Sequence, residues 1–107
     1  MSTSEAKIIV QKFVNHLKGK KYPLKSVYLF GSYARGNFHK WSDIDVAVVS
    51  THKRISPRDE VDRSMALILL SHEVNNLIEP HYFTEADFNN DGSPLAYEIR
   101  QTGIKIV

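Results

Sequence analysis

The sequence has 107 residues, a length that fits one domain, so residues 1–107 are expected to form a single domain. The formal net charge of +2 is too small to indicate a polybasic surface, so nucleic acid is not expected as the main partner. The absence of cysteine excludes disulfides, Cys-type zinc sites and thiol nucleophiles; with neither a signal peptide nor a membrane span visible, we expect a cytoplasmic protein with no membrane partner.

The first predicted element is a helix that ends at about Gly19. Ser2 and Glu5 have the Ser-x-x-Glu spacing of a capping box. Large apolar residues then recur every four positions, at Ile9, Phe13 and Leu17. This period is typical of a helix that buries one face.

Two apolar runs that favour β structure follow, at residues 27–30 and 43–49. The first run stops at Gly31, as a buried strand would. The segment between the runs contains Gly31, Gly36 and Asn37 and is too rich in turn residues for a long element, but it has room for one helical turn.

The second half predicts two helices and two strands. Ser56-Pro57 and Ser93-Pro94 each read as a cap followed by a proline in the first helical position. An apolar stripe is predicted on the first of these helices, at Val61, Met65, Ile68 and Leu69. A third strand is expected over residues 77–83, where Pro80 indicates an edge or a bulge, and a last strand over residues 104–107, after Gly103. The order predicts an α/β or α+β fold in which helices cover a small mixed sheet.

The strongest chemical signal is the pair Asp43 and Asp45. Strand residues two apart point to the same face, so the two carboxylates are expected side by side while Ile44 enters the core. Two unit charges about 4 Å apart repel by about 4 kcal/mol at an effective dielectric of 20, so either one carboxylate is protonated or a divalent cation lies between them. Oxygen ligands favour Mg²⁺ over zinc.

The segment before this pair has the residues of a phosphate site. Gly31 allows close approach of the backbone, and Ser32 is expected to cap the short turn and to donate to a phosphate oxygen. For Arg35, phosphate contact and a structural salt bridge are both open, and for Ser42 a hydrogen bond to the backbone ahead of the strand is an alternative to nucleotide binding.

Other motifs were weighed against this one. The Gly-x4-Gly spacing from Gly31 to Gly36 is not a P-loop, because Asn37-Phe38 stands where Lys and Ser or Thr are required. The histidines show no metal-ligand spacing with one another, so no histidine site is predicted. Trp41 is interpreted either as a surface aromatic or as a surface on which a nucleotide base packs.

Gly31-Ser32, ten residues, then Asp43-x-Asp45 resembles the signature of the minimal nucleotidyltransferase branch of the DNA polymerase beta-like superfamily. Ala34-Arg35-Gly36 and Ser42 match as well. The resemblance implies a nucleotidyltransferase fold, two Mg²⁺ ions held by Asp43, Asp45 and a third carboxylate, and a Gly31-Ser32 turn that holds the triphosphate of ATP or another nucleoside triphosphate.

By position in the chain, Glu79 resembles the third carboxylate, and Glu73 and Asp87 are weaker alternatives. The catalytic and metal-binding set is therefore Asp43, Asp45 and Glu79. The nucleotide-binding set is Gly31, Ser32, Arg35 and Ser42. One of the carboxylates, with Glu79 favoured, is also a candidate to help deprotonate the acceptor.

Minimal members of this branch are similar to the antitoxins of two-gene systems whose toxin is an all-helical HEPN protein, silenced by adenylyl transfer. The resemblance thus implies transfer of AMP from ATP to a hydroxyl on a HEPN-type partner. A binding module that blocks a toxin without turnover is the main alternative, and nucleic-acid binding without catalysis is a third. Any acceptor-binding surface beyond this domain must come from a partner or from a second copy of the chain.

Overall fold

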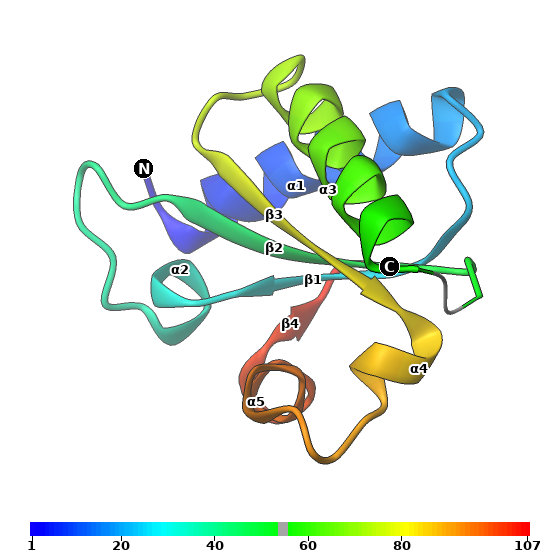
Figure 1. The fold of residues 1–107 in the computed structure, drawn as a ribbon. Coiled ribbons are helices and arrows are strands. Elements are labelled where there is room, and N and C mark those ends of the chain that lie inside the picture. Colours follow the sequence, from blue (N-terminus) through cyan, green and yellow to red (C-terminus); the bar gives the residue numbers. More distant parts are fainter. Residues whose placement is uncertain (54–55) are drawn as a thin grey trace.

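The computed structural model describes residues 1–53 and 56–107 of the chain (Figure 1). The strands in this part are β1 (Leu24–Phe30), β2 (Ile44–Ser50), β3 (Ile78–Thr84) and β4 (Ile104–Lys105). The helices are α1 (Thr3–Gly19), α2 (Ser32–Arg35), α3 (Pro57–His72), α4 (Glu85–Phe88) and α5 (Pro94–Thr102). The predicted order of elements is confirmed, and α4 is an additional short helix that the sequence analysis missed.

The strands form one mixed sheet in the order β3-β2-β1-β4. β1 is antiparallel to both β2 and β4, whereas β2 and β3 are parallel and are connected through α3. The predicted fold class, a small mixed sheet covered by helices, is therefore confirmed.

The two faces of the sheet are covered by different helices (Figure 1). On one face, Ile44, Val46 and Val48 of β2 pack in a core that also contains the buried face of α1 and Leu67 of α3. On the other face, a smaller core joins β2 to α4 and α5; its buried members are Ala47, Val49, Phe88, Ala96 and Ile99. Because side chains alternate along a strand, Asp45 lies on the same face of β2 as Ala47 and Val49.

The helix caps follow the sequence closely. Ser2 accepts a hydrogen bond from the Glu5 N–H, and the Glu5 carboxylate accepts one in return from the Ser2 N–H, which completes the predicted capping box. The hydroxyls of Ser56 and Ser93 cap α3 and α5, each followed by the predicted proline.

The helix α3 is predicted correctly, but the face predicted to be buried is mostly exposed. Of the four residues of that face, Ile68 is half-buried, and Val61, Met65 and Leu69 are exposed, at 60%, 56% and 66% of their surface. The residues that the helix buries are Leu67 and Ser71. Polar groups on the inner face explain the error: the Ser71 hydroxyl bonds the Ile68 carbonyl, and the Arg63 guanidinium donates to the Tyr82 hydroxyl of β3. Because these side chains are polar, the buried face does not show as an apolar pattern in the sequence.

β3 is continuous through Pro80. All seven residues pair with β2, and Pro80 stands in register with Val46. β3 is an edge strand of the described sheet, so a missing N–H is tolerated where it would point away from β2. The predicted edge position is confirmed. The last strand is shorter than predicted and covers only Ile104–Lys105. None of the helices in the described ranges has the length and apolarity needed to cross a membrane.

Candidate functional site

The turn between β1 and α2 depends on Gly31. Its φ is +74°, in the left-handed region that residues with a Cβ rarely adopt. A Cβ built at Gly31 would overlap the carboxylate of Asp45. The close approach predicted for this glycine is therefore an approach to the neighbouring acidic side chain.

Asp45 and Glu79 are direct neighbours on adjacent strands. They stand opposite each other in the parallel register of β2 and β3, close to where both strands begin. Phe30, the last residue of β1, is the partner of Asp45 on the other side. The Asp45 side chain is 26% exposed and the Glu79 side chain 54% exposed. Two acidic groups thus share one open end of the sheet.

Asp43 lies one residue outside the strand in which it was predicted. β2 begins at Ile44, and Asp43 is exposed just before it. Its carboxylate is nevertheless close enough to Glu79 to contribute to raising the pKa of that side chain. The structure therefore brings all three sequence-predicted carboxylates to one place, although the alternation argument applies only to residues from Ile44 onward.

A pocket of about 410 Å³ opens around these carboxylates. It is lined by Ser32, Asn37, His39, Trp41, Ser42, Asp43, Asp45 and Glu79. Trp41, the single tryptophan of the chain, is 73% exposed, with the Lys40 ammonium 5.1 Å from its ring centroid. An open aromatic surface therefore lies beside the acidic groups.

The pKa of Glu79 is raised from its usual range. Partial burial is the largest cause, and the neighbouring charge of Asp45 adds to it, while His81 opposes the shift and Asp43 reinforces it. Such a shift means that the ionised form of Glu79 is disfavoured here. A divalent cation would favour that ionised form, so cation and proton compete for the same carboxylate.

The two serines of the motif have different surroundings. Ser32 is the first residue of α2, whose N-cap is Gly31, and no side chain caps this helix. The prediction that Ser32 caps the turn is therefore wrong, because Gly31 holds the N-cap position and Ser32 is the first helical residue, where it lines the pocket. Ser42 is buried and accepts a hydrogen bond of 2.8 Å from the His39 N–H, the backbone role that was left open.

Three other candidates lie away from the pocket lining. Arg35 reaches Glu98 of α5 at 3.7 Å, which is the structural alternative weighed for it, and its contact with phosphate stays a prediction. Glu73 is paired with His16 at 2.7 Å. Asp87 lines a different pocket, beside α4. Of the three carboxylates considered as third, Glu79 is the one beside Asp45.

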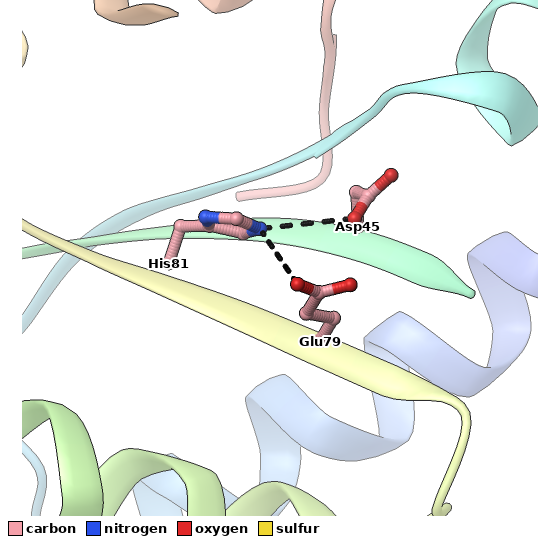
Figure 2. Close-up of side chains that lie close together, drawn as sticks. All are labelled: Asp45, Glu79 and His81. Atoms are coloured by element: carbon pink, nitrogen blue, oxygen red, sulfur yellow. Dashed lines mark ion pairs between the residues drawn. The ribbon is translucent and has the colours of Figure 1, made fainter.

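His81 is the site residue that the sequence analysis missed. It lies two residues after Glu79 in β3 and so projects from the same face, and its Nε2 is 3.7 Å from Asp45 Oδ1 and 4.0 Å from Glu79 Oε1 (Figure 2). Histidines had been compared only with one another. The Glu-x-His spacing on a predicted strand was the signal that would have found it.

Comparison with solved structures places the fold. The chain superposes on a nucleotidyltransferase structure from Sulfolobus solfataricus, named as putative, with a TM-score of 0.60 and 22% identity, covering 98% of this chain and 86% of that one. It also superposes on a toxin-antitoxin crystallised with AMP-PNP, with a TM-score of 0.57 and 21% identity, covering 91% and 71%. At these identities the likeness is one of fold.

The mixed sheet and the carboxylates beside a glycine turn are the features that the family resemblance predicted. Residues 10–102 match the family model described as the nucleotidyltransferase domain, so the chain belongs to this family. The predicted family is thereby confirmed.

Sequence relatives give a narrower match. A Methanocaldococcus jannaschii protein named "Putative protein adenylyltransferase MJ0604" is 49% identical over 41 residues, which is 37% of this chain and 41% of that relative. Three more proteins of this organism carry the same kind of name. The chain spans about half or less of the length of these relatives.

Proposed function

We propose that residues 1–107 act as one minimal nucleotidyltransferase domain that transfers AMP from ATP to a hydroxyl on a protein partner. The observation that carries this proposal is the register pairing of Asp45 with Glu79 beside Gly31, in one pocket with Ser32 and Asp43. The names of the M. jannaschii relatives support protein adenylylation as the reaction.

The donor set fits a hard divalent cation. Asp43, Asp45 and Glu79 offer carboxylate oxygens only, which suit Mg²⁺ and the phosphates that accompany it. When bound, a pair of such ions would offset the charge that develops on the attacking and leaving oxygens. Burial is the main cause of the raised pKa of Glu79, and the charges of Asp45 and Asp43 add to it; a bound cation would offset that repulsion.

The transfer itself exchanges one bond for another. The acceptor oxygen forms a bond to the α-phosphorus, the bond from that phosphorus to the bridging oxygen of the β-phosphate breaks, and pyrophosphate leaves. The hydroxyl proton passes to a carboxylate of the site, with Glu79 the favoured acceptor because it stands beside Asp45 and lines the open pocket. The Ser32 hydroxyl on the pocket wall is assigned to a phosphate oxygen.

The partner is proposed to be a small all-helical protein of the HEPN type, with this chain as its antitoxin. The fold shared with a toxin-antitoxin that was crystallised with AMP-PNP supports this role. The open position of the site also supports it, because a hydroxyl must be held about 3 to 3.5 Å from the phosphorus and a docked partner surface would hold it there.

Transfer is tested by incubating the protein with Mg²⁺, a candidate all-helical partner protein, and ATP labelled at either the α- or the γ-phosphate. We expect label on the partner from α-labelled ATP only, and none with Asp43→Ala. Label from γ-labelled ATP would contradict nucleotidyl transfer. Tight binding without any label would contradict the enzyme hypothesis and favour the main alternative, a module that blocks the partner without turnover.

Base recognition by Trp41 is tested through its own fluorescence, because it is the only tryptophan. We expect ATP with Mg²⁺ to change the emission, whereas inorganic triphosphate, which has no base, changes it much less. Trp41→Ala is expected to weaken ATP binding by about 1 kcal/mol or more, the scale of one base stacked on an aromatic ring. Equal emission changes with both ligands would show that Trp41 does not recognise the base.

A further inference from the structure

The proposed site contains a nitrogen ligand that the carboxylate motif does not include. His81 points its Nε2 between Asp45 of β2 and Glu79 of β3 (Figure 2). One atom from each of these three side chains lies within 4.8 Å of the other two. Asp43 is not a member of this group. Asp45 and Glu79 therefore belong to two sets, one with Asp43 in the pocket and one with His81.

The two distances from the imidazole nitrogen fit ligands around one ion better than they fit hydrogen bonds. At 3.7 and 4.0 Å, neither carboxylate is within hydrogen-bonding range of the imidazole. Ligand atoms about 2.1 Å from a common cation, at angles between 90° and 180°, are separated by about 3 to 4.2 Å. Both measured distances fall in that interval.

The imidazole nitrogen is also buried without a partner. The His81 side chain is 31% exposed, but its Nε2 atom is covered and accepts or donates no hydrogen bond within the described residues. Buried polar atoms are nearly always satisfied, and a cation shared with the two carboxylates would satisfy this nitrogen.

Packing fixes the direction in which this nitrogen points. The Phe30 ring at the end of β1 meets the His81 ring edge to face, with centroids 5.1 Å apart and planes at 66°. Glu79 and His81 project from the same face of β3 because they are two residues apart. The orientation is therefore set by the sheet and not by a mobile side chain.

We propose that Asp45, Glu79 and His81 hold one divalent cation, and that the imidazole makes this position select Mn²⁺ over Mg²⁺. This inference rests on the proposed function, since it concerns the cation of that same site. Mg²⁺ is a hard ion that takes oxygen ligands, whereas an imidazole ligand raises affinity for first-row transition ions much more than for Mg²⁺. His81 is then the residue that decides which ion the pocket retains.

The test measures binding of the bare ions to the full chain without nucleotide. Mn²⁺ is titrated by the loss of its free electron paramagnetic resonance signal, and Mg²⁺ by competition. In the wild type we expect bound Mn²⁺ to show ¹⁴N coupling in pulsed spectra. In His81→Gln that coupling should disappear, and the preference for Mn²⁺ over Mg²⁺ should fall by about tenfold or more, at least the scale of losing a residue that supports a metal ligand.

Two variants separate this inference from the proposed function. His72→Gln, an exposed histidine at the end of α3, is expected to keep both the coupling and the preference. Asp45→Asn is expected to lose binding of both ions. If the wild type shows no ¹⁴N coupling, or His81→Gln keeps the wild-type preference while Asp45→Asn loses binding, the role of His81 is overturned and the carboxylate site stands. If Asp45→Asn also binds like the wild type, the proposed function falls with it.

Discussion

Replacing Asp45 with asparagine is expected to abolish the stabilisation that ATP and Mg²⁺ give to the folded chain. A ligand at a hundred times its Kd adds about 2.7 kcal/mol to the free energy of unfolding, which for a chain of this size raises Tm by roughly 10 °C. Asp45 lies against the Gly31 turn and stands opposite Glu79, so the variant loses one of the two carboxylates that both cation sets share. Differential scanning fluorimetry with and without ligand measures the shift.

Without ligand, the same substitution is not expected to lower the Tm. Asp45 contributes to raising the pKa of Glu79, so removing its charge relieves a repulsion and the Tm of the ligand-free variant should be equal to or above that of the wild type. Asp62→Asn is the matched control, because Asp62 is exposed on α3, and α3 covers the other face of the sheet. If ATP and Mg²⁺ raise the Tm of Asp45→Asn as much as that of the wild type, Asp45 is not a ligand of the cation.

Much of the site was predictable because its residues are adjacent in the sequence or follow strand alternation. Gly31 and Ser32 sit on one turn, and Asp45 follows from the strand that begins beside it. Glu79 is more distant in the chain, and the family resemblance identified it where physical spacing did not. Its register with Asp45 depends on the parallel pairing of β2 and β3, which is set by the crossover through α3.

The features that escaped prediction depend on contacts between elements. The rotation of α3 is set by Leu67 against the sheet and by the bond of Arg63 to Tyr82, neither of which shows in the apolar pattern. His81 becomes part of the site only because β2 brings Asp45 beside β3. Ser32 failed as a cap because the positive φ of Gly31 decides where α2 begins.

Gly31 offers the sharpest test of how the fold builds the site, because the chain contains a second glycine with a positive φ at the other end of the same short helix. Gly31 and Gly36 have φ values of +74° and +79° and flank the same short helix. Their ψ values differ, at −149° for Gly31 and +9° for Gly36. Alanine at Gly36 therefore meets the strain of the left-handed region, about 1 to 2 kcal/mol, whereas Gly31 has a conformation that is essentially confined to glycine, so alanine there costs more stability. Their surroundings differ: an added Cβ at Gly36 has no atom within 4 Å, whereas at Gly31 it overlaps the Asp45 carboxylate.

Gly31→Ala is therefore expected to lose ATP and Mg²⁺ binding by a hundredfold or more, about 2.7 kcal/mol or above, because Asp45 must leave its place opposite Glu79. Gly36→Ala should lose only the strain energy in stability and keep its affinity to within a fewfold. Calorimetric titration gives the affinities, and urea unfolding gives the stabilities with which to correct for strain. If the two variants bind ATP equally well at equal stability, the contact between Gly31 and Asp45 does not organise the site, and the turn serves only to reverse the chain.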